Sequence, residues 1–191
     1  MPTADKDPPK ILDSVTVFRG RVFDVTIDTI KEGDITYQRE VVQHPGSAVI
    51  LPVFNDDTVA LVRQYRHPAR RYLLEAPAGT LNDREAPEVG AARELEEELG
   101  FVAAKLEKIS EFFVSPGFCE EKMWVFLATE LTATAQRLDH DEILEVERIP
   151  FSQALEMITK GEIEDAKTII ALMLAAPRVG KTLLEIEYPA V

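Results

Sequence analysis

The stretch Gly79–Phe101 reads GTLNDREAPEVGAARELEEELGF and carries the strongest local signals in the chain. Proline is tolerated in the first turn of a helix and glycine commonly follows the last turn, which are the places of Pro87 and Gly100. These signals predict a helix over residues 85–99. The predicted helix is the best-defined element from which the rest of the chain can be read.

Three glutamates of this helix share one face, because Glu94, Glu97 and Glu98 are spaced i, i+3 and i+4. Like charges at this spacing cost roughly a few tenths of a kcal/mol per pair, and the C-terminal half of a helix disfavours anions. A hard divalent cation such as Mg²⁺ removes the penalty, since it takes carboxylate oxygens and binds substrate phosphates. A merely solvated acidic face is the plain alternative. The opposite side is expected to pack on a sheet through Val89, Ala92, Leu95 and Leu99.

On either side of the helix, short strands alternate with a few helices. The order lacks a strict βαβ rhythm, so the expected fold is α+β or a three-layer sandwich. Residues 1–45 are expected to form a tail and a small antiparallel β element that is too small to be stable alone, and residues 46–191 the main domain. The expected strands are 23–28, 35–42, 47–54, 58–64, 72–75, 104–114, 122–129 and 143–149, and the further helices are 152–160 and 165–175.

The charge balance excludes several classes of partner. Lys and Arg number 21 against 34 Asp and Glu, which gives a net charge of −13. Such a chain lacks the cations that bind nucleic acid or an anionic membrane surface. The longest purely apolar run, Ile169–Ala176, has eight residues, where a membrane-spanning helix needs about 20. Cys119 is the only cysteine, and residues 1–10 contain no apolar stretch, so a cytoplasmic location is expected.

The spacing of residues through Gly79–Phe101 resembles the signature of the Nudix hydrolase family at every fixed position. The resemblance implies the Nudix fold, an α/β/α sandwich around a mixed central sheet, in which this segment forms a loop, a helix and a loop. It also implies hydrolysis of a nucleoside diphosphate that is linked to another moiety. The matching residues are Gly79, Glu85, Arg93, Glu94, Leu95, Glu97, Glu98, Gly100 and Phe101.

The resemblance also assigns roles within the signature. It makes Glu94, Glu97 and Glu98 the ligands of Mg²⁺ or Mn²⁺, with Glu97 and Glu98 counted among the catalytic residues. The carbonyl of Ala78 is a further expected metal ligand. Arg93, also counted as catalytic, would orient the glutamates, and an ordinary salt bridge is physically almost the same arrangement. The bound ion would lower the pKa of a water and offset charge on the diphosphate.

Outside the signature, the chain is similar to the ADP-ribose pyrophosphatases of this family. The run Leu61–Gly79, LVRQYRHPARRYLLEAPAG, resembles that subgroup's approach to the signature, and Pro116 stands sixteen residues beyond Gly100, as in ADP-ribose hydrolases. The resemblance implies conversion of ADP-ribose to AMP and ribose 5-phosphate. A broader nucleoside-diphosphate-sugar hydrolase, for example one acting on GDP-mannose, is the alternative. A non-catalytic nucleotide-sensing module is a third reading, which the complete set of signature glutamates disfavours.

The subgroup resemblance adds site residues outside the signature. An acidic residue on a loop in the C-terminal half assists catalysis in that subgroup, and Glu142 takes this position, with Asp141 as the alternative. Arg66 matches a substrate-contacting arginine, and a guanidinium suits a pyrophosphate or a stacked base. The other expected substrate-side residues are Glu75, Pro116, Glu121, Arg39 and Glu40.

A homodimer is expected, because the small N-terminal β element cannot bury both of its faces alone. The subgroup typically exchanges this piece between subunits, so Arg39 and Glu40 would reach the nucleotide of the neighbouring subunit. The expected partners are therefore a small nucleoside diphosphate sugar and a second copy of the chain, with no nucleic acid and no membrane.

Overall fold

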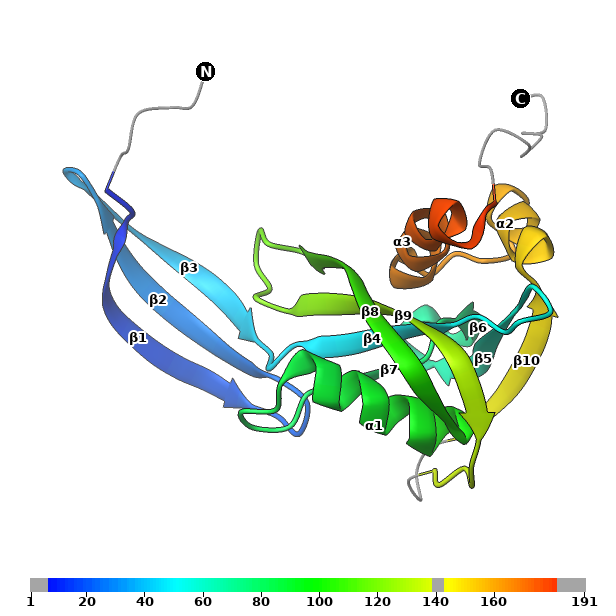
Figure 1. The fold of residues 1–191 in the computed structure, drawn as a ribbon. Helices are drawn as coiled ribbons and strands as arrows, with labels where there is room; N and C mark the ends of the chain where they lie inside the picture. The colour runs from blue at the N-terminus through cyan, green and yellow to red at the C-terminus, as the bar shows by residue number, and fades with distance from the viewer. Residues whose placement is uncertain (1–6, 139–142, 182–191) are drawn as a thin grey trace. The chain divides into compact units, whose positions relative to one another are not determined.

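The computed structural model describes residues 7–138 and 143–181 (Figure 1). The described residues form two compact units. The smaller unit extends through the N-terminal residues to Gly46 and includes Phe113–Lys122, and the larger unit contains residues 47–112 and those from Met123 onward. Within the described part of the chain, no helix has the length and apolar character needed to cross a membrane.

The smaller unit is a three-stranded antiparallel sheet. Strands β1 (Lys10–Arg19), β2 (Asp24–Glu32) and β3 (Ile35–Gln43) lie in the order β1-β2-β3. A turn joins β2 and β3, and Gly33 adopts there a φ of +58°, which favours glycine. All ten residues of β1 are exposed, whereas β2 buries Thr26.

The segment Phe113–Lys122 joins this sheet although it is distant in sequence. The backbone N–H of Val42 donates to the carbonyl of Phe118 at 2.8 Å, and the N–H of Glu120 donates to the carbonyl of Val42 at 3.0 Å. Two backbone hydrogen bonds to one residue hold the segment against the end of β3. The division expected from the sequence, 1–45 and 46–191, placed this segment in the main domain, whereas the structure includes it in the smaller unit.

The larger unit contains a mixed sheet. Strand β4 (Ser47–Pro52) runs parallel to β9 (Lys122–Ala133) and antiparallel to β7 (Ala78–Thr80), and β8 (Phe101–Phe113) lies beyond β9. The mixture of strand directions agrees with the sheet expected from the sequence. Strand β7 was not predicted, because a strand of three residues is too short to show a period of two.

The second sheet of this unit is antiparallel. Strand β5 (Thr58–Arg66) lies between β10 (Leu144–Pro150) and β6 (Arg71–Glu75). Arg66 at the end of β5 pairs with Arg71 at the start of β6, and Glu75 at the end of β6 pairs with Val62 of β5. Because side chains alternate along a strand, Arg66 and Glu75 lie on the same face of this sheet.

Helices cover the sheets on both sides (Figure 1). Helix α1 (Pro87–Leu99) shares a core with Ala48 and Ile50 of β4, whereas Val49 and Leu51 belong to the core on the side of α2 (Phe151–Thr159) and α3 (Ala166–Ala175). Alternate residues of one strand thus enter two different cores, which gives the predicted α/β/α layers. The short 3₁₀ turns are η1 (His67–Ala69) and η2 (Ala176–Val179).

Helix α1 begins two residues later than predicted and ends where predicted. Glu85 stays in the loop, where its carboxylate accepts a hydrogen bond from the N–H of Asn82 at 2.9 Å. Gly100 ends the helix in the left-handed conformation with a φ of +67°. A Cβ at this position would also lie 2.9 Å from the backbone nitrogen of Gln136, so both the turn and the close approach require glycine.

The buried side of α1 differs from the predicted apolar side. Val89 is 59% exposed and Ala92 is also exposed, so the expected set does not pack on the sheet as a whole. The small residues Gly90 and Ala91 face inward instead, and they allow the helix to approach its neighbours closely. Two of the three glutamates consequently lie on the buried side. The buried residues of the helix are Gly90, Ala91, Glu94, Leu95, Glu98 and Leu99.

Candidate active site

Arg93 lies at the centre of the acidic cluster and binds three carboxylates with one guanidinium. Its Nη1 donates to Glu94 Oε1 at 2.7 Å and to Glu97 Oε2 at 2.9 Å. Its Nε and Nη2 donate to the two oxygens of Glu85, each at 3.0 Å. Nη2 also donates to the carbonyl of Thr80 at 3.3 Å. The planar fork of this guanidinium therefore ties α1 to the loop that precedes it.

The pairing of Arg93 with Glu85 shifts the pKa of both groups. Hydrogen bonds from Arg93, assisted by the backbone N–H of Asn82, lower the pKa of Glu85 to about 2. The pKa of Arg93 rises above its ordinary value because Glu85 accepts its hydrogen bonds, and Glu94 and Glu97 add to the rise against the opposing effect of burial. The charged state of the pair is therefore favoured throughout the neutral pH range.

Glu94 and Glu98 lie one turn apart on the buried side of α1, with exposed fractions of 6% and 5%. The carboxylate of Glu94 packs directly on Gly79, because a Cβ added to Gly79 would lie 1.8 Å from Glu94 Oε1. Glycine alone leaves room for the carboxylate at this point of the loop. The adjacent residue Ala78 is held by its pairing with Val49 of β4. The helix carboxylates and the loop backbone are therefore packed together.

A second charged cluster lies where β5 and β6 meet the beginning of α3. Nε and Nη2 of Arg66 donate to the two oxygens of Glu75, both at 2.8 Å, and Lys167 also donates to Glu75. Burial opposes ionisation of Glu75, but hydrogen bonds from Arg66 and the charge of Lys167 outweigh it and lower the pKa of Glu75. Glu75 in turn raises the pKa of Arg66, and the charge of Glu98 adds to that rise. Arg66 is thus within electrostatic range of the acidic helix.

The structure brings the predicted residues Arg66 and Glu75 together and adds Lys167, which sequence reasoning missed. No local signal in the sequence pairs Lys167 with Glu75. Asp165 is the N-cap of α3 and accepts a hydrogen bond from the N–H of Thr168 at 3.0 Å. An aspartate in that place marks a helix start. The helix predicted over residues 165–175 therefore already placed Lys167 in the first turn of α3, but no local pattern indicates that this turn lies against Glu75.

The C-terminal end of α1 is bound by residues that follow β9. Gln136 Nε2 donates to the carbonyl of Glu98, and the N–H of Arg137 donates to the carbonyl of Glu97 at 2.9 Å. Donors at this end satisfy carbonyls that a helix leaves open and oppose its negative pole. No sequence signal identified these two residues. The predicted catalytic Glu142 and its alternative Asp141 lie outside the described residues.

Comparison with known proteins decides the family. Residues 44–172 match the family model described as the NUDIX domain. The chain belongs to the Nudix family. An ADP-ribose pyrophosphatase of Bacillus subtilis (strain 168) is 39% identical over 166 residues, covering 85% of this chain and 90% of that protein. A GDP-mannose pyrophosphatase of Enterobacter sp. (strain 638) is 40% identical over 179 residues, also covering 85% of this chain and 90% of that protein.

A solved structure shows the same fold. The crystal structure of an ADP compounds hydrolase matches this Nudix protein with a TM-score of 0.80 at 24% sequence identity, covering 93% of this chain and 97% of that chain. Since the identity is low, the match concerns the fold. The three-layer Nudix fold expected from the signature is therefore confirmed.

Nudix hydrolases generally need a divalent metal, and the ligands predicted for this Nudix protein from the signature are all oxygen donors. Glu94, Glu97, Glu98 and the carbonyl of Ala78 supply only oxygen atoms, which hard divalent cations prefer. Glu94 and Glu97 already converge on one nitrogen of Arg93. In the described ranges, 7–138 and 143–181, no three His, Cys, Asp or Glu side chains are arranged around a common metal position. Arg93 is the group that joins the carboxylates in this arrangement.

The remaining predicted residues lie in the smaller unit of this Nudix protein. Arg39 is exposed on β3, with its guanidinium 4.3 Å from the centre of the Tyr37 ring. Glu121 lies 3.7 Å from the ring nitrogen of His44. The structure thus gives Arg39 and Glu121 separate partners. Two further predicted residues, Glu40 and Pro116, are exposed.

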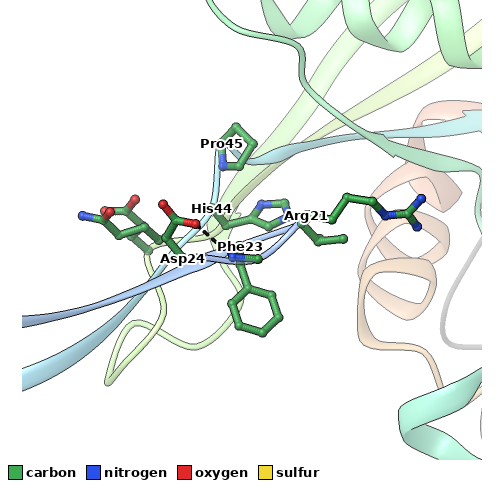
Figure 2. Close-up of a pocket in the computed structure, with 9 residues that line it drawn as sticks. Arg21, Phe23, Asp24, His44 and Pro45 are labelled. Carbon is green, nitrogen blue, oxygen red and sulfur yellow. Dashed lines mark hydrogen bonds between the residues drawn. The ribbon is translucent and has the colours of Figure 1, made fainter. Parts of the chain in front are cut away.

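A pocket of about 370 Å³ lies in the same unit, lined by residues 20–24, residues 43–45 and Glu120 (Figure 2). The carboxylate of Asp24 accepts a hydrogen bond from the N–H of Gly20 at 3.2 Å. Figure 2 shows the Arg21 side chain extending away from Asp24. The lining combines charges of both signs with the Phe23 ring, and none of the site residues predicted from the sequence belongs to it.

Proposed function

We propose that this Nudix hydrolase cleaves the pyrophosphate bond of ADP-ribose and releases AMP and ribose 5-phosphate. The observation that carries the proposal is the set of three glutamates on α1, of which Glu94 and Glu97 are bound by Arg93 and Glu94 packs on Gly79. The relative named ADP-ribose pyrophosphatase, 39% identical over most of both chains, supports the choice of substrate. Pro116, at the spacing of ADP-ribose hydrolases, supports it as well.

The proposed metal is Mg²⁺, held by Glu94, Glu97, Glu98 and the Ala78 carbonyl, with Mn²⁺ as a substitute. When bound, such an ion activates a water and offsets the charge of the diphosphate in the displacement. Arg93 keeps Glu94 and Glu97 turned toward each other through its two Nη1 hydrogen bonds. Without this cation the carboxylates would repel one another.

The remaining proposed roles belong to residues outside the signature. Arg66 retains a 39% exposed side chain, so its guanidinium can bind a phosphate oxygen while Glu75 fixes its orientation. Glu142 would accept the proton of the attacking water, with Asp141 as the alternative. The exchange of one P–O bond for another adds water to the diphosphate and yields two phosphate monoesters.

A second candidate is the hydrolysis of GDP-mannose. The Enterobacter relative that bears this activity in its name is 40% identical over 179 residues, so the comparison supports it nearly as much. The two candidates differ in base and sugar, whereas the diphosphate chemistry is the same. The substrate is therefore the property that an experiment has to decide.

A substrate panel tests the proposal. The purified chain is incubated with Mg²⁺ and ADP-ribose, GDP-mannose or another nucleoside diphosphate sugar, and phosphate monoesters are measured with a phosphatase-coupled assay. The expected result is the highest kcat/KM for ADP-ribose, with AMP and ribose 5-phosphate as the products. A higher kcat/KM for GDP-mannose establishes the second candidate. Tight ADP-ribose binding with no turnover of any compound contradicts both and indicates a nucleotide sensor.

We also propose a cytoplasmic homodimer in which the N-terminal sheet contacts a second copy. All residues of β1, including the apolar ones, are exposed to solvent in the single chain. Light scattering is expected to give twice the mass of the chain, and a monomer would contradict the proposal. A single cysteine among 191 residues supports the reducing location, which cell fractionation tests. The exposed apolar residues are Ile11, Leu12, Val15, Val17 and Phe18.

A further inference from the structure

The carboxylate of Glu75 is buried between two cations. Its side chain is 1% exposed, and it accepts hydrogen bonds from Arg66 and from Lys167. A buried carboxylate is costly unless charged partners compensate it. The fork of Arg66 already engages both oxygens of Glu75, so hydrogen bonding alone does not require a second cation. The presence of Lys167 therefore calls for a different explanation.

Lys167 is enclosed, whereas Arg66 is open. The side chain of Lys167 is 8% exposed and that of Arg66 is 39% exposed. Nζ of Lys167 also lies 3.0 Å from Oδ2 of Asp165, the N-cap of α3, so the ammonium is held from two sides. A ligand that enters from solvent meets Arg66 and not Lys167. Any influence of Lys167 on a ligand must therefore act through Glu75.

The same helix start also fixes the backbone that leads to the signature. The hydroxyl of Thr168 donates to Asp165 at 2.5 Å and accepts a hydrogen bond from the N–H of Ala76 at 2.6 Å. Pro77, which follows Ala76, accepts at its carbonyl a hydrogen bond from the N–H of Ile50 in β4 at 2.9 Å. The charged cluster is thus attached to a backbone that has little freedom to relax if one charge is removed.

The charges of the cluster are balanced. Arg66 and Lys167 are positive, and Glu75 and Asp165 are negative, so the charges of the four groups sum to zero, and the charge of Glu98 also acts on Arg66. Without Lys167 the sum becomes negative, and Glu75 neutralises Arg66 alone. An anionic diphosphate would then approach a cluster whose net charge is negative. In the wild type, Glu75 is shared between Lys167 and Arg66, so Arg66 keeps part of its positive charge for the diphosphate.

We infer that Lys167 is a positioning residue that takes up the charge of Glu75, so that Arg66 stays available as a cation for the diphosphate of the substrate. The inference rests on the proposed function, because it names how that substrate is held. It requires that Lys167 acts on binding more than on the chemical step, and that its effect disappears when the charge of Glu75 is removed.

The test compares Lys167→Met, Lys167→Arg and the double variant Lys167→Met/Glu75→Gln in Mg²⁺ with ADP-ribose. Lys167→Met is expected to raise KM about tenfold with little change in kcat, whereas Lys167→Arg stays near the wild type. The double variant restores the charge balance and is expected to return KM toward the wild-type value. Lys181→Met is the matched control, because Lys181 pairs with Asp57, which precedes the first residue of β5, whereas Arg66 is its last residue. This control also removes one positive charge, and its KM should not change.

Thermal unfolding provides a second readout that needs no substrate. Lys167→Met should unfold at a lower temperature than the wild type, and Glu75→Gln in the same chain should restore much of the loss. If Lys167→Met fails to fold, recovery of folding in the double variant supports the inference, and its absence overturns it. An unchanged KM in Lys167→Met, or a double variant as impaired as the single one, also overturns it. Wild-type protein that hydrolyses no panel substrate refutes the proposed function instead.

Discussion

The contact between Gly79 and Glu94 leads to a prediction for Gly79→Ala. The added methyl group would lie 1.8 Å from Glu94 Oε1, and ordinary van der Waals contact begins at 3.4 Å, so the oxygen must move by about 1.6 Å. Such a shift breaks the 2.7 Å hydrogen bond from Arg93 and displaces the carboxylate from the cluster. Misplacement of a catalytic group by about 1 Å can cost about a hundredfold in rate, so kcat is expected to fall by at least that factor.

The assay measures kcat for ADP-ribose over a range of Mg²⁺ concentrations, together with the free energy of unfolding. Overpacking at Gly79 should cost about 1–3 kcal/mol of stability. Gly161→Ala is the matched control, because Gly161 has a φ of +70° with nothing within 4 Å of an added Cβ. The control should lose about 1–2 kcal/mol through its backbone conformation and keep its kcat. A Gly79→Ala variant with a kcat within about threefold of the wild type would refute the reasoning.

Three further experiments probe the same cluster. Glu98→Gln should lose about a hundredfold or more in kcat with an unchanged circular dichroism spectrum, and near-normal kinetics at limiting Mg²⁺ would defeat its assignment as a ligand. Arg93→Lys keeps the charge but loses the fork that binds three carboxylates, so both kcat and the unfolding temperature should fall; retention of both would contradict the role of the fork. The unfolding temperature should fall as the pH is lowered from about 4.5 to about 2. The ionised form of Glu85 contributes fully to stability above its ordinary pKa, and this contribution is lost as Glu85 becomes protonated near its lowered pKa. Glu85→Gln should flatten this part of the pH profile.

Local patterns predicted much of the fold because they depend on neighbours along the chain. Pro87 and Gly100 bracket α1 through backbone geometry that each imposes at its own position. Strand β2 appears in the sequence as alternating apolar and polar residues. Glu85 illustrates the limit of this approach, since its hydrogen bond with Asn82 and its pairing with Arg93 keep it out of the helix that the pattern predicted.

The buried side of α1 shows the same limit more clearly. Apolarity favoured Val89 as a packed residue, yet Val89 is 59% exposed and Glu94 is 6% exposed. The choice of face depends on which side lets the helix come close to the Gly79 loop, and Gly90 and Ala91 permit that approach. The ion pair with Arg93 compensates the charge of the buried Glu94.

The amino-acid sequence alone was sufficient to predict the signature helix, its three glutamates and the layered fold, because spacing along a helix or strand translates directly into shared faces. Only the tertiary structure revealed the contacts of Lys167 with Glu75 and of Gln136 with Glu98, which join residues 92 and 38 positions apart. Such contacts arise when separate elements pack against one another, and the periodicity of residues within one helix or strand does not indicate them. Which charges meet, and therefore which cations hold the site together, is decided by the packing of α3 and of the segment after β9 on the rest of the fold.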